Sequence, residues 1–216
     1  MNFESIYNTN FMHQDYMQQW KNIFDKDILR GSVNIIALYI TVYELLEDTI
    51  IFRPKNFYVD FESDDRAKQQ YEQEVLALYD KEACPGLNTK NKALIASLLW
   101  FKNNGAIDDH DIQVFIESRK LRNKITHEMY GAIVDGGSAI VEQFALLYCL
   151  FCKIERWWII EIEVSITDEI PADAEIDVNG VMSGNMIVLN VVMDILLNDS
   201  NIHFKKVCES LGVEVK

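Results

Sequence analysis

The stretch from 33 to 52 limits the fold more than any other part of the chain, because it is apolar on nearly all sides. Its acids, Glu44, Glu47 and Asp48, come only toward its end. A helix that is apolar all round has to be buried among other elements. The 216 residues include only 9 Gly and 3 Pro, so the chain should form long regular elements with few turns. We therefore expect an all-α fold around one buried central helix.

Apolar residues at spacings of three and four predict further helices. One is expected from Phe11 to Leu29, with Gly31 and Ser32 separating it from the central helix, which Pro54 would end. The others are expected at 63–82, 88–103, 108–135, 138–163, 185–197 and 202–211. Residues 176–181 hold an Asn-Gly turn between short alternating runs, which predicts a β-hairpin.

An acidic stretch marks a boundary toward the C-terminus. Residues 168–177 contain five acids, no base and one proline, which indicates a solvated connector. We therefore expect a helical domain over 1–164. The remaining residues, 165–216, would form a small appendage of short helices and the hairpin that packs on this domain.

The formal net charge of −14 argues against a protein that binds nucleic acid through bulk electrostatics, so any RNA contact should be local. The same charge suits a basic protein partner. The longest apolar stretches, around 33–46 and 144–152, are too short or too interrupted by charge to supply the roughly 20 apolar residues that a membrane span needs. The four cysteines are scattered and the N-terminus lacks a secretory signal pattern, so we expect a cytoplasmic protein.

One cationic cluster stands out in this acidic chain, and His127 follows it. Its members are Arg119, Lys120, Arg122 and Lys124. On charge alone, such a cluster is more often a solvated helix face than a site. RNA, however, can be cleaved without a metal when its own 2′-hydroxyl attacks the neighbouring phosphate. That reaction needs a proton carrier near neutral pH, a role for His127, and a fixed cation on the phosphate oxygens, a role for Arg122.

Residues 121–127, Leu-Arg-Asn-Lys-Ile-Thr-His, resemble the Arg-Asn-x-x-x-His signature of the HEPN superfamily of toxin, abortive-infection and other antiviral ribonucleases. The resemblance covers residues 33 to 164 and implies an antiparallel helical bundle, a homodimer groove and metal-independent RNA cleavage. It implies charge stabilisation by Arg122, proton transfer by His127, and orientation of the phosphate or the imidazole by Asn123. The candidates for RNA binding are Arg119, Lys120 and Lys124.

The spacing of this motif makes a structural demand. On a straight helix, residues five apart point about 140° apart, so Arg122 and His127 would not share a face. The helix could fray within 123–126, a groove could wrap around it, or two subunits could each supply one group. Cyclising cleavage usually uses both a base and an acid, and each chain offers one His127. We therefore expect a homodimer with an isologous interface.

Two other functions suit the same sequence. The chain could be a non-catalytic helical module that binds a basic protein, or the acidic partner that neutralises a toxin; a toxin, in turn, would have an antitoxin partner. Other candidate sites have simpler explanations. Cys149 and Cys152 lie in an apolar helix and should be buried thiols, and the acids of 108–111 should cap a helix start. We expect no metal and no cofactor.

Overall fold

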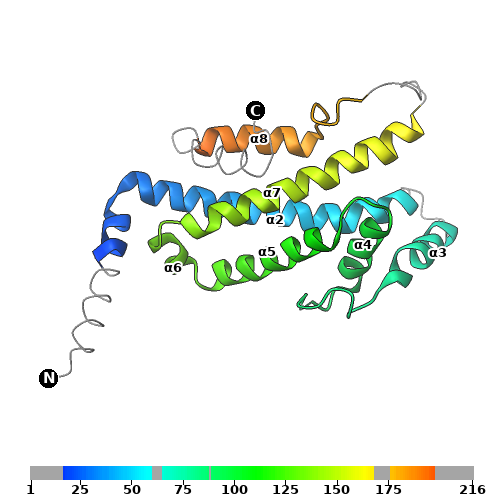
Figure 1. Ribbon diagram of the computed structural model, residues 1–216, viewed down its shortest axis with the longest axis horizontal. Coiled ribbons are helices and arrows are strands. Elements are labelled where there is room, and N and C mark those ends of the chain that lie inside the picture. The colour runs from blue at the N-terminus through cyan, green and yellow to red at the C-terminus, as the bar shows by residue number, and fades with distance from the viewer. Residues whose placement is uncertain (1–16, 60–64, 88, 168–175, 198–216) are drawn as a thin grey trace.

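The computed structural model describes residues 17–59, 65–87, 89–167 and 176–197, and over these ranges it contains helices and no strand (Figure 1). Residues 17–24 are helical. The elements that follow are α2 (Lys26–Tyr58), α3 (Asp65–Glu74), η1 (Leu76–Leu78), α4 (Lys92–Asn103), α5 (Asp109–His127), α6 (Met129–Val134), α7 (Ser138–Trp157), η2 (Trp158–Glu163), η3 (Val164–Ile166) and α8 (Gly184–Leu197). The prediction of an all-α fold is confirmed.

Helix α2 is the central element and contacts every α-helix from α3 to α8. Its fully buried side chains recur at spacings of three and four, and each stabilises the fold by roughly 1.5–3 kcal/mol. They include Tyr39, Val42, Leu46 and Ile50. Helices α2 and α7 run in one direction, and α5 and α8 run in the opposite direction (Figure 1). No helix in the described ranges is long and apolar enough to cross a membrane.

The start of α2 differs from the expected one. The helix passes through Gly31 and Ser32 without a break and begins instead after Asp25. The Asp25 carboxylate accepts hydrogen bonds from the backbone N–H groups of Asp27 and Ile28, at 3.0 and 3.1 Å. Ser32 donates its hydroxyl to the Ile28 carbonyl at 2.8 Å, so its side chain bonds within the helix and caps nothing.

The end of α2 was also predicted wrongly, because Pro54 lies inside the helix. A proline in a helix interior removes one hydrogen bond and costs about 3 kcal/mol. Packing of the last turn offsets this cost. Phe57 lies edge-on to Trp158, with ring centroids 6.1 Å apart, and Tyr58 lies edge-on to Trp100 at 6.4 Å.

Two other helices are shorter than expected. The helix predicted over 63–82 ends at Glu74 and is followed by the single turn η1, and part of its expected cap, 63–64, lies outside the described residues. Helix α4 begins at Lys92, a few residues after the predicted start at 88, because the Asn91 side chain accepts the backbone N–H of Leu94 at 3.2 Å.

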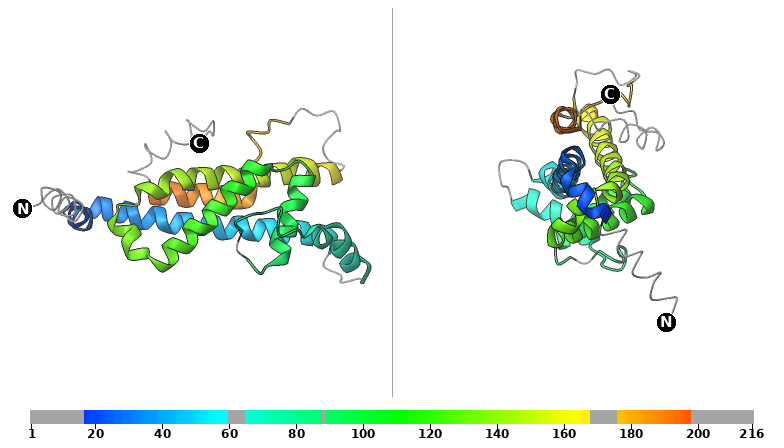
Figure 2. Two further views of the ribbon diagram at one scale, coloured as in Figure 1. Left: turned by 60° about the horizontal axis from the view of Figure 1, so that its bottom comes forward. Right: turned by 90° about the vertical axis from the view of Figure 1, so that its left-hand side faces the viewer.

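The C-terminal part is helical where it is described. Helix α8 confirms the helix expected at 185–197, and it lies against α2 and beside α7 (Figure 2). Asn34 of α2 donates to the Leu196 carbonyl at 2.8 Å, and Tyr148 of α7 donates to Asn190 at 2.6 Å. The expected β-hairpin is not formed, since 176–183 contains a turn and no strand; an isolated hairpin is marginal in water. The helix expected at 202–211 lies outside the described residues.

A buried ion pair joins α2 to α7. Glu155 is fully buried, and its carboxylate accepts a hydrogen bond from Thr49 at 3.2 Å and one from Arg53 at 3.0 Å. Arg53 also bonds to Glu163 at 2.7 Å, and its guanidinium lies over the Trp158 ring, 5.4 Å from the centroid. The paired tryptophans of the sequence thus pack at this end of the bundle, Trp158 buried and Trp157 half-buried, and the arginine neutralises the one carboxylate that is buried among the described residues.

Candidate functional site

Helix α5 carries the whole cationic cluster, and its first turn is fixed by a capping box. The Asp108 side chain accepts the backbone N–H of Asp111 at 3.0 Å, and the Asp111 side chain accepts that of Asp108 at 2.9 Å. The helix was expected to continue to 135, but it ends at His127, because Glu128 leaves the helical conformation (φ −125°, ψ 34°) and α6 begins after it. His127 is therefore the last residue of α5.

The bend in the chain follows the motif and does not fall within it. Residues 123–126 are regular helix, and the Thr126 hydroxyl donates to the Arg122 carbonyl at 2.8 Å. Fraying inside the motif is therefore not how Arg122 and His127 could meet. The remaining possibilities are a groove around the helix and a site shared by two subunits.

Arg119 faces α2 and is engaged there. Its Nη1 donates to the Tyr43 hydroxyl at 2.9 Å and to the Glu47 carboxylate at 3.1 Å. Burial acts to lower the pKa of Arg119, but Tyr43 and Glu47 beside it outweigh burial and leave that pKa raised. Burial, reinforced by Glu47, likewise raises the pKa of Tyr43. Arg119 thus joins two helices, and its guanidinium is not free to contact RNA.

Arg122 also faces α2, one turn further along. Its Nε donates to Glu44 at 3.0 Å, its Nη2 donates to the same carboxylate oxygen, and its guanidinium lies 5.6 Å from the centroid of the Tyr43 ring. Its Nη1 reaches only Asn123, at 3.4 Å, and the side chain is 33% exposed. Glu44 therefore holds one edge of the guanidinium and leaves Nη1 for another acceptor.

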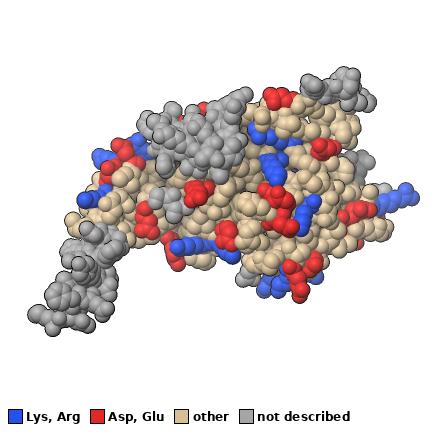
Figure 3. All heavy atoms as spheres, viewed as in Figure 1, with Lys and Arg blue, Asp and Glu red and all other residues tan. Residues whose placement is uncertain are grey.

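Sequence reasoning did not connect these arginines with Glu44 and Glu47, although a signal was present. The two acids lie three residues apart on an otherwise apolar helix, and the two arginines lie three residues apart on a second helix. Residues three apart share a helix face, so each pair presents the same spacing to the other. On the face shown in Figure 3, basic and acidic side chains likewise lie next to one another.

His127 shares its side of α5 with lysines. At about 100° per residue, His127 lies roughly 60° from Lys124 around the helix and roughly 140° from Arg122. Lys120 lies on the same side and is paired with Glu117 at 2.9 Å. Lys124 and His127 are exposed, and neither side chain bonds to any residue in the described part of the chain. The cation available beside the histidine in one subunit is therefore Lys124.

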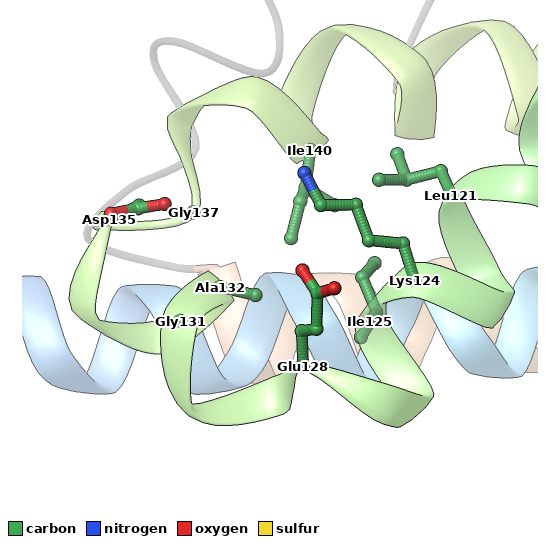
Figure 4. A pocket seen from close by; sticks show the side chains of 9 residues that line it. All are labelled: Leu121, Lys124, Ile125, Glu128, Gly131, Ala132, Asp135, Gly137 and Ile140. Carbon is green, nitrogen blue, oxygen red and sulfur yellow. The ribbon is translucent and has the colours of Figure 1, made fainter.

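A small pocket adjoins this side of the helix, at the corner formed by α5, α6 and α7 (Figure 4). Its volume is about 130 Å³. Lys124 and Glu128 point toward it, and its wall is largely aliphatic (Figure 4). The lining residues are Leu121, Lys124, Ile125, Glu128, Gly131, Ala132, Asp135, Gly137 and Ile140. This pocket could not be predicted from the sequence, because its walls come from three helices that meet only in the fold.

One cluster of metal-ligand types occurs in the described residues, at the start of α5. Donor atoms of Asp108, His110 and Asp111 lie within 4.8 Å of one another. Both carboxylates already form the capping box, and Asp111 also accepts a hydrogen bond from Lys153. The backbone N–H of Asp111 lowers the pKa of the Asp108 carboxyl. Helix capping thus accounts for the cluster.

The Cys-x-x-Cys pair lies in α7, as expected for structural thiols. Cys152 is buried and Cys149 is half-buried. Burial raises the pKa of Cys149 to about 11 and that of Cys152 to about 12. A metal ligand or a nucleophile has to be a thiolate, so neither cysteine is prepared for that chemistry at neutral pH.

We expect both cysteines to resist iodoacetamide at pH 8 in the folded protein. Their raised pKa values leave roughly a hundredfold or more less thiolate than an ordinary cysteine has at that pH. Peptide mass spectrometry after timed labelling measures the modification, with the same reaction in guanidinium chloride as the fully reactive control. Labelling of Cys152 at equal rates in both conditions would contradict the burial.

No family model, curated protein or solved structure matches this chain. The resemblance to the HEPN superfamily therefore rests on residues 121–127 alone, and it stays a prediction. The fold adds the geometry of the motif. His127 and Lys124 lie on one side of α5 with no side-chain partner among the described residues, and Arg122 is bonded to Glu44 on another side. A pocket lies beside Lys124.

Proposed function

We propose that the protein is a metal-independent endoribonuclease of the HEPN type that acts in toxin-antitoxin or anti-phage defence. The observation that carries this proposal is that His127 and Lys124 lie next to each other on the surface of α5. Both are exposed, both lack partners among the described residues, and both lie on one side of α5 in a chain of net charge −14. Histidine is the side chain that most often transfers protons in catalysis, and a free ammonium beside it suits a reaction at a phosphate.

The reaction uses the 2′-hydroxyl of the RNA as its nucleophile. Neutral His127 accepts the proton of this hydroxyl while the 2′-oxygen bonds to phosphorus. The bond from phosphorus to the 5′-oxygen breaks, and an imidazolium donates a proton to that leaving oxygen. The products are a 2′,3′-cyclic phosphate and a 5′-hydroxyl. Lys124 and the outward Nη1 of Arg122 stabilise the negative charge on the phosphate oxygens.

A homodimer is part of the proposal. Because Arg122 and His127 point to different sides of one regular helix, a single phosphate contacts both most simply when two subunits meet at this helix. The same arrangement supplies the second proton carrier, since His127 of the partner subunit donates to the leaving oxygen. Glu44 acts as a positioning residue, because it holds the Arg122 guanidinium in one orientation.

The first test is incubation of the purified protein with total RNA in EDTA. We expect cleavage that leaves 2′,3′-cyclic phosphate and 5′-hydroxyl ends, which end-specific ligation and phosphatase treatment identify on one gel. An oligonucleotide with 2′-deoxyribose throughout should stay intact, since it lacks the nucleophile. Cleavage that requires magnesium, or that cuts the deoxy substrate equally well, would rule out this mechanism.

A second function, a helical protein-interaction module, is favoured by the outward face of α8. Four β-branched side chains on this face are between 51% and 71% exposed and lie on one stripe. They are Ile187, Val188, Val191 and Ile195. A protein without nuclease activity that forms a complex of fixed stoichiometry with a basic protein, lost on Val191→Asp, would favour this function instead.

A further inference from the structure

The pocket beside Lys124 has the size and walls of a site for one planar ring. Its wall includes the buried side chains of Ile125 and Ile140 and the half-buried side chain of Leu121. The volume of about 130 Å³ is close to that of an aliphatic cavity, about 150 Å³, that holds benzene in another protein. The six-membered ring of a base therefore fits, whereas the rest of the nucleotide, with its sugar and phosphate, has to remain outside.

The charged groups at the pocket favour binding of a nucleobase and repel a phosphate. Glu128 and Asp135 contribute two carboxylates and Lys124 contributes one ammonium, so the lining carries a net negative charge. Lys124 and Glu128 both point into the pocket (Figure 4) and form no ion pair with each other or with any other described residue. One acceptor group and one donor group thus face the space where a ring would sit.

Resting on the proposed ribonuclease function, we propose that this pocket binds guanine of the RNA substrate. The six-membered ring of guanine carries two adjacent donors, N1–H and the N2 amino group, next to the O6 acceptor. A carboxylate accepts from both donors at once, and such charge-assisted paired bonds are strong and directional. Glu128 binds these donors.

The other bases fit this arrangement less well. Adenine and cytosine each present one amino donor to the carboxylate, and the single N–H of uracil lies between two carbonyl acceptors that repel it. The position along the chain also fits. Glu128 directly follows His127, and Lys124 precedes it by one turn. A base held in the pocket therefore leaves its phosphate outside, near the end of α5 that carries the motif.

Binding of short RNAs tests the pocket separately from catalysis. The probes are fluorescein-labelled tetranucleotides in which a 2′-deoxy substitution blocks cleavage and one position is guanine, inosine, adenine, cytosine or uracil. By fluorescence anisotropy, wild-type protein should bind the guanine probe about tenfold or more tighter than the adenine, cytosine and uracil probes. Inosine lacks the N2 amino group and should fall between.

The variant Glu128→Gln should lose this preference for guanine over inosine. The matched control Glu72→Gln removes the same charge from the exposed face of α3 and should keep it. Equal affinity for all five probes, or an unchanged preference in Glu128→Gln, would overturn the proposal. A guanine preference in a protein that cleaves no RNA would support the pocket while removing the ribonuclease function.

Discussion

Replacing His127 with alanine should lower the rate of RNA cleavage by about 100-fold or more, the usual loss when a general acid or base is removed. The fold should be unaffected, because His127 is exposed at the end of α5 and its side chain bonds to no described residue. Initial rates on an end-labelled RNA in EDTA measure the first effect. Thermal unfolding monitored by circular dichroism measures the second.

His110→Ala is the matched control for this variant. His110 is also exposed and also lies on α5, but it is in the first turn, at the opposite end of the helix from the motif. Its replacement should leave the cleavage rate within about twofold of wild type, because surface changes away from a site perturb little. If His127→Ala cleaved as fast as His110→Ala, the assignment of proton transfer to His127 would be wrong.

Replacing Arg53 with methionine should lower the free energy of unfolding by about 3–5 kcal/mol, the usual result of removing one partner of a buried ion pair. The carboxylate of Glu155 is fully buried, and without Arg53 its only bonded partner among the described residues is the Thr49 hydroxyl. A buried charge without a compensating cation is strongly unfavourable. Equilibrium unfolding in urea measures the difference.

Two further variants separate the buried pair from the exposed one. Glu163 pairs with the same arginine but is 47% exposed, so Glu163→Gln should cost less than about 1 kcal/mol. The double variant Arg53→Met with Glu155→Met removes both charges and should recover most of the lost stability. An Arg53→Met protein as stable as Glu163→Gln would show that Glu155 needs no cation.

Much of the fold follows from periodicity, but the ends of helices do not. The central helix was predicted because its apolar residues leave no side for solvent, and that is a local property of 33–52. Its ends depend on tertiary contacts. Packing of Phe57 and Tyr58 against the tryptophans of other helices carries α2 past Pro54. The Asn-Gly turn at 179–180 forms without a strand on either side, because a turn signal does not supply a partner for pairing.

The sequence predicts that the candidate residues share one helix, but it does not predict their geometry. The sequence alone located α5 and the cluster on it, because the types and spacing of the motif are visible there. The identity of the cation beside His127 depends on where α5 ends and on which residues of neighbouring helices face α5. Glu44 draws Arg122 toward α2 and leaves Lys124 beside the histidine, and Glu128 gains its position only from the bend that ends α5.

The ion pair between Glu44 and Arg122 exposes both positions to two selective pressures, one on the packing of α2 against α5 and one on the proposed catalysis. A mutation at Arg122 that harms catalysis also leaves Glu44 without its partner between α2 and α5. A mutation at Glu44 releases the arginine to which the proposed mechanism assigns the phosphate oxygens. Descendants of this chain that keep the fold and the proposed activity should therefore change these two positions together or retain both, whereas the pair of Lys120 with Glu117, which lies within one helix, places no such constraint between helices.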